Sequence, residues 1–335
     1  MKTKTLGWIE NNMGGNDLNS DFTIVYMGSP AFAVGPLSAL IEEGYSVPLV
    51  VSQPDKPKGR KGVLTPTAVK SWALEHQIPV ITPANVNDAA VVEQIRACHP
   101  DLLVVTAFGQ ILRKPLLELA PHGAVNIHAS LLPKYRGAAP IHFAIMNGER
   151  VTGVTTMFMD EGLDTGDMVL QAAVEISEND NLQTLQEKLI PLGSELIVET
   201  VQLIQDHLEP REPQLEEESS YAHKILPEQE KISFNRSATE VHNQIRALSP
   251  EIGAYAGFER GTKKMKFWKT SLTEETASEA PGTLEKVDKK AIYVATADNL
   301  LRVLELQPAG KGKMRAVDWW RGQQKNYTDT KLRFE

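Results

Sequence analysis

Residues 124–168 read AVNIHASLLPKYRGAAPIHFAIMNGERVTGVTTMFMDEGLDTGDM, and this stretch decides how the chain is interpreted. Two strand-like runs, AVNIHA and VTTMFM, alternate with turns rich in Gly and Pro. Asn126 and His128 alternate with apolar residues, so in a strand both polar side chains point to the same face. Asp164 follows in the turn-rich segment EGLDTG. An amide, an imidazole and a carboxylate are the equipment for acid–base chemistry at a carbonyl group.

These polar residues also have structural explanations. Taken singly, Asn126 and His128 are better explained as hydrogen-bonded residues of a strand. Their place on one strand face, directly before SLLPKYRG, favours a functional pair. Asp164 has a competitor in Asp167, because either carboxylate suits a turn and the spacing does not choose between them. The apolar turn at residues 131–133 suits a rigid wall for a flat ligand.

Composition excludes several classes of protein. The chain has 335 residues, of which 41% are hydrophobic and 23% charged, as is ordinary for a soluble globular protein with two domains. A single cysteine, Cys98, excludes an intrachain disulfide framework and fits the cytoplasm, and we expect it to be structural. No apolar run is long enough for a membrane helix. Residues 1–21 form a polar extension without the features of a signal peptide. Four histidines lack ligand spacing, so no metal is expected: His142, His207, His223 and His242.

The first two thirds of the chain alternate between strand and helix patterns. Strands are predicted at 22–28, 47–52, 101–107 and 124–129, and helices at 31–43, 67–76, 85–97, 138–147 and 182–205. This rhythm predicts an α/β domain with a Rossmann-like, mostly parallel sheet covered on both faces. The first strand ends in MGSPAFA and not in G-x-G-x-x-G, so a dinucleotide is not indicated.

The pattern changes after a segment rich in Pro and Glu. KISFN, KMKFWKT, GTLEKV, AIYVATA and LLRVLELQP are short strand-like runs, with one helix expected at 238–248. They predict a smaller OB-like β-barrel. We therefore divide the chain into an N-terminal extension (1–21), a catalytic domain (22–205), a linker (206–222) and a C-terminal β-barrel domain (223–335).

The charge is distributed unevenly. The net charge of −8 argues against broad nucleic-acid binding, yet the loop PDKPKGRKG at 54–62 carries four bases and one acid. The last part of the chain, from 259 to 333, also has an excess of Lys and Arg. Two basic regions on an acidic protein indicate a polyanion that binds at one place.

Several stretches resemble those of the methionyl-tRNA formyltransferase family, within the folate-dependent formyltransferase superfamily. MGSPAFA, QPDKPKGRKG, AFGQIL, NIHASLLPKYRGAAPI and MDEGLDTGDM occur in the family's order and spacing, and the resemblance covers nearly all the chain after residue 21. It implies transfer of a formyl group from 10-formyltetrahydrofolate to methionyl initiator tRNA. We expect the enzyme to be a cytoplasmic monomer that uses no metal.

The resemblance also assigns residues. Asn126, His128 and Asp164 fall on the catalytic positions, which decides between Asp164 and Asp167. Asn126 and a protonated His128 are expected to donate hydrogen bonds to the oxyanion, with Asp164 keeping His128 charged. The folate positions are Phe108, Gly109, Gln110, Ile111, Leu112, Ser130, Leu131, Leu132 and Pro133. The tRNA-contacting loop falls on Lys56, Lys58, Arg60 and Lys61. The barrel is expected to hold tRNA, without individual contacts assigned.

Three alternatives remain open. A formyltransferase acting on an amino sugar nucleotide explains the catalytic trio equally well, but it does not need the basic loop or the basic barrel. A 10-formyltetrahydrofolate hydrolase, in which water replaces the amine, is also compatible with the trio. A non-catalytic RNA-binding module does not explain an intact Asn, His and Asp set.

Overall fold

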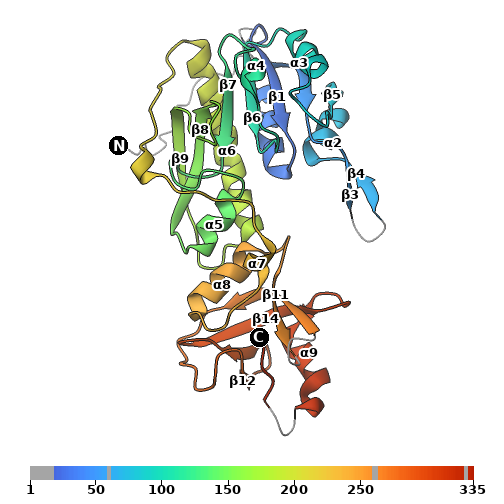
Figure 1. Cartoon of the computed structure of the whole chain (residues 1–335), viewed down its shortest axis with the longest axis vertical. Helices are drawn as coiled ribbons and strands as arrows, with labels where there is room; N and C mark the ends of the chain where they lie inside the picture. The colour runs from blue at the N-terminus through green and yellow to red at the C-terminus, as the bar shows by residue number, and fades with distance from the viewer. Residues whose placement is uncertain (1–18, 59–61, 259–262, 328–330) are drawn as a thin grey trace.

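The structure is a computed structural model that describes residues 19–58, 62–258, 263–327 and 331–335. Two domains follow one another along the long axis of the molecule, and the segment between α6 and α8 connects them (Figure 1). The N-terminal domain contains an α/β sheet, and the C-terminal domain is built mainly from antiparallel strands. Both agree with the fold class predicted from the sequence.

The N-terminal domain contains a seven-stranded sheet in the order β5-β2-β1-β6-β7-β8-β9. The first five strands in this order, from β5 through β2, β1 and β6 to β7, pair in parallel. Strands β8 and β9 add an antiparallel pair at one edge. The elements are β1 (Thr23–Gly28), η1 (Ala31–Ala33), α1 (Val34–Glu42), β2 (Ser46–Val51), β3 (Lys56–Lys58), β4 (Val63–Thr65), α2 (Ala68–Glu75), β5 (Val80–Ile81), α3 (Ala89–Arg96), β6 (Leu102–Thr106), α4 (Lys114–Leu117), β7 (Ala124–His128), α5 (Pro140–Met146), β8 (Val151–Phe158), β9 (Met168–Glu175) and α6 (Leu182–Gln205).

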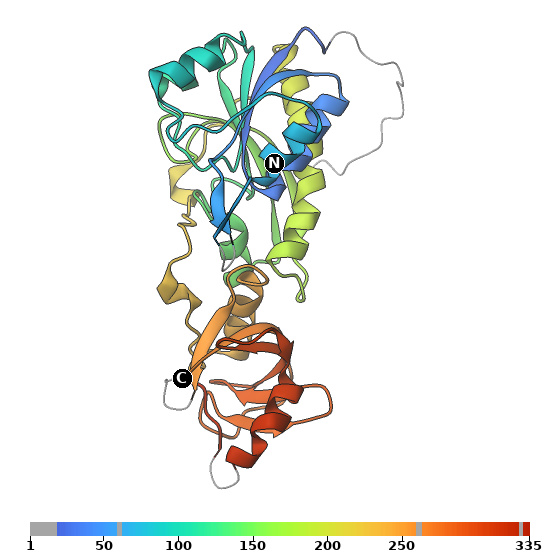
Figure 2. The same ribbon diagram turned by 90° about the vertical axis from the view of Figure 1, so that its right-hand side faces the viewer.

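Alternation along each strand gives the sheet two apolar faces, and helices cover both (Figure 2). On β7, Val125 and Ile127 pack into the core formed with α1, α2, α5 and α6. Ala124 belongs to the opposite core, formed with α3 and α4. Asn126 and His128 have the same parity as Ala124, so they share the face that the sequence pattern predicts.

The basic loop differs from its prediction. It forms a hairpin in which β3 pairs with β4, with Lys56 opposite Thr65 and Lys58 opposite Val63. Alternation is absent from this short run because Val63 and Leu64 are 62% and 66% exposed, so no core dictates its side-chain pattern. The hairpin follows β2 and projects from the carboxyl end of the parallel strands (Figure 1).

The C-terminal domain contains a six-stranded antiparallel sheet, with β15 beside β14 and the remaining strands in the order β10-β11-β14-β13-β12. KISFN is not a strand as predicted, since only Lys231 forms a bridge, to Tyr255. The elements from the linker onward are η2 (Glu216–Glu218), α7 (Pro227–Glu230), α8 (Ala238–Ala247), β10 (Ala254–Phe258), β11 (Lys263–Ser271), β12 (Leu284–Val287), β13 (Ile292–Ala295), β14 (Leu300–Pro308), β15 (Met314–Arg315), α9 (Ala316–Gln323) and η3 (Gln324–Asn326).

The last residues of the chain join the two edges of this sheet. Leu284 N donates to Leu332 O at 2.8 Å beside β12, and Glu335 N donates to Gly257 O on β10 at 2.8 Å. Phe334 between them lies in the apolar core of the domain. The sheet therefore closes into a small barrel, in agreement with the prediction.

A buried polar joint fixes α8 of the C-terminal domain against the turn before α6. Arg246 is 8% exposed, and its Nη1 donates to Ser177 O at 3.1 Å and to Asp180 O at 2.8 Å. His242 Nε2 lies 3.1 Å from Glu178 O. Satisfied buried hydrogen bonds of this kind hold one geometry, because a displaced partner would leave a buried donor unpaired.

We expect His142 on α5 to make the fold sensitive to acid. Burial lowers the pKa of His142 to about 4, and its buried Nε2 has no hydrogen-bond partner among the described residues. In the unfolded chain the His142 imidazole binds a proton near pH 6.5, whereas in the folded chain it stays neutral until the pH approaches 4. The contribution of neutral His142 to the free energy of unfolding is therefore complete above pH 6.5 and is lost as pH drops toward 4. The loss amounts to about 3 kcal/mol.

Urea unfolding of the wild type and His142→Leu between pH 4 and 8 measures this effect. The variant should lose much of the acid dependence, whereas His223→Gln, a change at an exposed histidine, should retain it. Equal slopes in the wild type and His142→Leu would contradict this role of His142.

Candidate active site

The end of β7 supplies two of the predicted site residues. Asn126 pairs with Met157 of β8 and His128 with Thr155, and their side chains are 8% and 5% exposed. Both lie toward the carboxyl edge of the parallel strands, where ligands bind in open α/β sheets. The sheet register therefore sets the spacing of an amide and an imidazole at this edge.

The loop between β8 and β9 brings Asp164 to the same place. Asp164 Oδ1 lies 3.4 Å from Asn126 Nδ2, and Asp164 Oδ2 lies 3.6 Å from His128 Nδ1. The backbone of Asp164 is left-handed, with φ of 54°, a conformation that few residues other than Gly adopt. The structure thus brings together the three residues that the sequence singled out, although they span 38 positions.

The segment after β7 orients these side chains, and sequence reasoning missed it. His128 Nε2 lies 2.9 Å from Tyr135 O, and a carbonyl only accepts, so Nε2 carries the proton of this hydrogen bond. Gly137 N donates to Asp164 Oδ2 at 2.8 Å. A Cβ on Gly137 would lie 2.8 Å from Ala222 O, and its φ is 114°, so the position requires glycine. The glycine of KYRG was the available signal.

The residues expected to contact folate divide into buried and accessible positions. Phe108 and Leu112 are buried in the apolar core. Gln110 has both its side-chain groups occupied, since Nε2 donates to Pro83 O and Oε1 accepts from Val86 N. Gly109 and Ile111 are exposed, Ile111 by 78%. This segment therefore offers its backbone and Ile111 to a ligand.

The second folate segment follows β7. Ser130 is fully buried and donates to Lys134 O at 2.6 Å, and Leu132 packs against Met157 and Met168. Leu131 and Pro133 are half-buried. The segment is a rigid turn in which only part of the predicted set remains accessible.

One buried donor at the carboxyl edge has no hydrogen-bond partner among the described residues. It is Nε2 of Gln53, the second residue after β2. It lies 3.7 Å from the position of a Cβ built on Gly109, where φ is 84°. A buried amide without a partner is costly, and a bound heterocycle with acceptor atoms would satisfy it. These residues therefore fit a folate, and the sequence offered Gln53 only as the first residue of QPDKPKGRKG.

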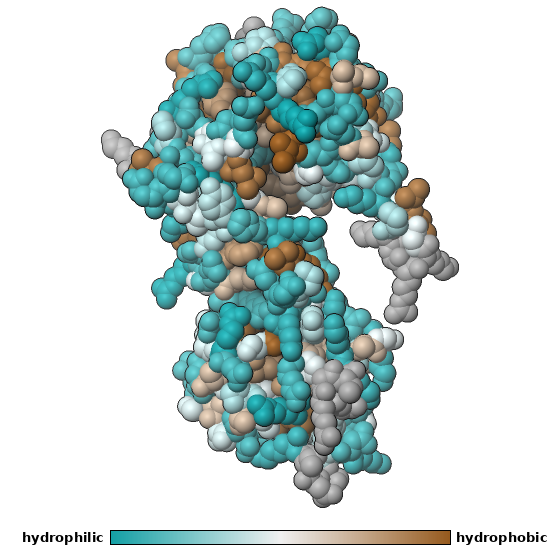
Figure 3. All heavy atoms as spheres, viewed as in Figure 1, coloured by the Kyte–Doolittle hydropathy of each residue, from teal (hydrophilic) through white to brown (hydrophobic). Residues whose placement is uncertain are grey.

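Of the predicted tRNA-contacting residues, Lys56 and Lys58 lie in β3, and Lys56 is exposed. Arg60 and Lys61 lie outside the described residues. Figure 3 shows the hairpin standing away from the body of the molecule, with apolar surface from β4. A projecting basic hairpin is suited to contact with a large anionic ligand.

The barrel presents a basic and aromatic face on β10 and β11. Lys264, Lys266 and Trp268 alternate with buried residues of β11. Lys313 Nζ lies 3.7 Å and Lys266 Nζ 5.6 Å from the centroid of a Trp268 ring, and Lys264 Nζ lies 4.3 Å from that of Tyr255. Cations beside half-buried rings of this kind are typical of surfaces that bind nucleic acids.

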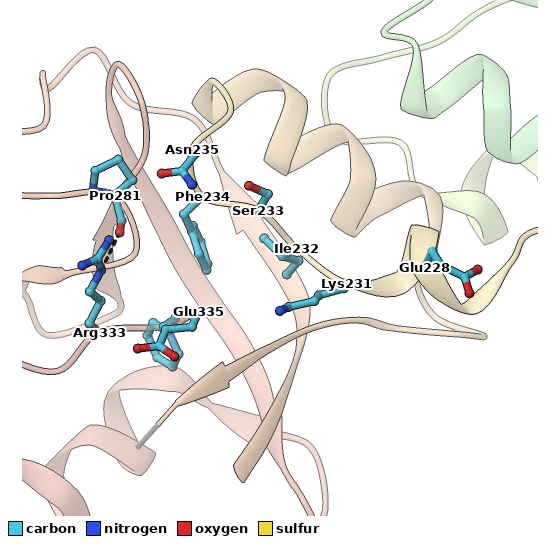
Figure 4. Close-up of a pocket in the computed structure, with 10 residues that line it drawn as sticks. Glu228, Lys231, Ile232, Ser233, Phe234, Asn235, Pro281, Arg333 and Glu335 are labelled. Carbon is cyan, nitrogen blue, oxygen red and sulfur yellow. Dashed lines mark hydrogen bonds between the residues drawn. The ribbon is translucent and has the colours of Figure 1, made fainter. Parts of the chain in front are cut away.

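A separate pocket of about 430 Å³ lies in the C-terminal domain, apart from the trio (Figure 4). Lys231, Phe234 and Glu335 line it, and Arg333 Nε donates to Pro281 O at 3.1 Å. Its walls mix both signs of charge, so they specify no class of ligand. Among the described residues, no group of three or more His, Cys, Asp or Glu is placed to hold a metal ion. Within all the described residues, no helix is long and apolar enough to cross a membrane.

Comparison with solved structures supports the fold. The chain superposes with a TM-score of 0.62 on an N-formyltransferase from Helicobacter canadensis in complex with folinic acid and dTDP-3-aminofucose, at 21% identity over 86% of this chain and 99% of that one. HypX from Aquifex aeolicus in complex with tetrahydrofolic acid gives a TM-score of 0.61, at 16% identity over 92% of this chain and 48% of that one.

Comparison of sequences goes further. Residues 22–201 match the formyl transferase family, and residues 224–324 match the formyl transferase C-terminal domain. A methionyl-tRNA formyltransferase of Bacillus subtilis (strain 168) is 46% identical, over 89% of this chain and 94% of its own length. That of Clostridioides difficile (strain 630) is 44% identical, over 89% and 96%. The chain therefore belongs to the formyl transferase family, among the methionyl-tRNA formyltransferases.

Proposed function

We propose that this chain transfers the formyl group of 10-formyltetrahydrofolate to the α-amino group of methionyl initiator tRNA, and that Asn126, His128 and Asp164 carry the reaction. One observation supports the assignment of residues above all. An amide donor, an imidazole and a carboxylate meet at 3.4 and 3.6 Å at the carboxyl edge of the sheet. All three come from one chain, so we propose a monomer as the working unit, and we place the reaction in the cytoplasm.

Asn126 and His128 act as hydrogen-bond donors. Attack by the amine places negative charge on the formyl oxygen, and donors held in advance stabilise that charge. Asn126 offers Nδ2. His128 offers Nδ1, because its Nε2 is engaged by Tyr135 O. The 3.6 Å between Nδ1 and Asp164 Oδ2 is too long for a hydrogen bond, which leaves a proton on Nδ1 available to the substrate.

Asp164 has two tasks. Its carboxylate faces His128 Nδ1 and stabilises a protonated imidazole when the formyl group is bound. It is also placed to act as a base, so it accepts the proton that the amine loses and passes it to the leaving nitrogen of the folate, directly or through water. The hydrogen bond from Gly137 N to Oδ2 holds the carboxylate in place during both tasks.

The folate supplies an activated formyl group on a nitrogen that leaves once it is protonated. The exposed Gly109 and Ile111 would hold its ring system. Gln53 would donate to it from the buried Nε2, which has no partner among the described residues. Leu131 and Pro133 would form the opposite, apolar wall.

The acceptor is held by two basic surfaces. The stretch of sequence from 56 to 61 carries Lys56, Lys58, Arg60 and Lys61, of which we propose Arg60 as the residue that acts near the acceptor end of the tRNA. The face of the barrel around Trp268 supplies lysines beside aromatic rings. Two separated surfaces suit an extended polyanion better than a sugar nucleotide.

A single-turnover assay tests the function. 10-Formyltetrahydrofolate is offered with methionyl initiator tRNA, methionyl elongator tRNA, an amino sugar nucleotide or no acceptor. Fast formylation of the initiator species supports the proposal. Transfer only to the sugar, or release of formate without any acceptor, would replace it with one of the two alternative activities.

Removal of Asn126 or Asp164 should affect turnover more than binding. Asn126→Ala and Asp164→Ala should each lower kcat by about 10²–10³-fold, because they remove a group that acts in the transition state. The Kd for tRNA should change less than about threefold, since an unaltered phosphate-binding surface provides most of the affinity. Steady-state kinetics and filter binding measure both quantities. Asp167→Ala is the matched control, and an undiminished kcat in Asp164→Ala would refute the assignment.

Charge removal in the hairpin should affect binding. Lys56→Ala and Arg60→Ala should each weaken tRNA binding and lower the slope of log Kd against log salt by about 1, because each loses a phosphate contact. Fluorescence titration from 50 to 300 mM KCl measures this slope. Lys114→Ala, on α4 and paired with Glu118, should keep the wild-type slope. A wild-type slope in both hairpin variants would argue against phosphate contacts there.

A further inference from the structure

The linker between the domains is hydrogen-bonded to the catalytic domain just after the Asp164 loop and again in the segment that follows β7. Glu212 and Met168 exchange backbone hydrogen bonds of 2.9 and 3.0 Å beside the Asp164 loop. Further along, Arg136 N donates to Ser220 O at 2.8 Å, and Ala222 N donates to Arg136 O at 2.7 Å. The linker therefore contacts the catalytic domain at two points, through Met168 and through Arg136.

Between these points, Gln214 reaches the backbone of the Asp164 loop. Its Nε2 donates to Asp164 O and to Gly166 O, both at 2.8 Å. Asp164 has a left-handed backbone, which for a residue other than Gly persists only where surrounding contacts hold it. Both protons of one side-chain amide are thus used to fix the turn that carries the carboxylate.

A buried arginine sets the direction of that amide. Arg136 is 1% exposed, and its Nε donates to Gln214 Oε1 at 2.9 Å. A guanidinium only donates, so Oε1 must face it and Nε2 must face the two carbonyls. Arg136 Nη1 donates to Glu216 Oε2 at 2.7 Å, and this bond holds the pKa of the Glu216 carboxyl below its usual range. In each of these hydrogen bonds an N–H group of Arg136 or Gln214 thus faces an oxygen that accepts it.

We propose that Gln214 is a positioning residue for Asp164, and that the linker is in this way part of the active site. The inference rests on the role of Asp164 proposed above. Gln214 touches no reacting atom. It acts by holding the backbone of Asp164 so that the carboxylate stays beside Asn126 and His128, and Arg136 holds Gln214 in turn.

Gln214→Leu tests the proposal, because leucine has a similar size but neither donates nor accepts. We expect kcat to fall about 10- to 100-fold, as a small displacement of a catalytic group suffices for such a loss. KM for the folate and for methionyl initiator tRNA should change less than about threefold. Gln229→Leu, a change in α7 at a glutamine whose side chain accepts from Leu226 N beyond the linker, is the matched control and should keep the wild-type kcat.

A double variant separates positioning from a general loss of structure. In the Asp164→Ala background, Gln214→Leu should lower the single-turnover rate less than twofold further, because the carboxylate that it positions is gone. Gln214→Glu is the second variant: it keeps an acceptor for Arg136 but turns a carboxylate oxygen toward the two carbonyls. It should lower kcat at least tenfold with a Tm close to that of the wild type.

Wild-type kcat in both Gln214 variants would overturn the inference. So would a fall in kcat that comes with a KM change of similar fold and a clearly lower Tm. The third contrary result would be that Gln214→Leu lowers the rate of Asp164→Ala by as much as it lowers that of the wild type. Failure of the underlying function is distinguishable from these. In that event Asp164→Ala itself would keep its kcat, or no formyl group would reach the tRNA.

Discussion

The position of the Asp164 carboxylate is the constraint on which the rest of the site depends. Its two oxygens face Asn126 Nδ2, His128 Nδ1 and Gly137 N–H, so the loop that carries it must turn back sharply. The left-handed backbone of Asp164 provides that turn. Gly137 is required because any side chain there would press against Ala222 O. The left-handed turn at Asp164 and the close approach of the Gly137 backbone thus both serve to place the carboxylate that we propose as the base.

The segment that lies beside the Asp164 loop also connects the catalytic domain to the barrel. The linker lies beside the Asp164 loop before it enters the C-terminal domain, and α8 is fixed to the turn before α6 through Arg246. A tRNA that contacts both the barrel and the β3–β4 hairpin therefore meets a trio at a defined distance. Fixed placement of a large acceptor lets distant contacts contribute to the reaction at the formyl carbon.

Sequence alone predicted the parts of this arrangement that obey periodic rules. The apolar strands, the helix at Leu182–Gln205 and the shared face of Asn126 and His128 follow from alternation and helical spacing. The hairpin at 56–65 was missed because its strands have no buried face. Gln214 and the carbonyl of Tyr135 were missed for another reason: both make hydrogen bonds between a side chain and an irregular stretch of backbone. Such bonds depend on how distant segments meet, and they leave no periodic signal.

The orientation of the His128 ring tests the account most directly, because it decides which nitrogen faces Asp164 and the substrate. ¹⁵N NMR of protein labelled at histidine, with His128 assigned by comparison with His128→Gln, reports the protonation of each nitrogen. We expect a neutral ring with its proton on Nε2, bound to Tyr135 O, and a second proton that enters at Nδ1. A neutral ring protonated on Nδ1, with Nε2 bare, would contradict it.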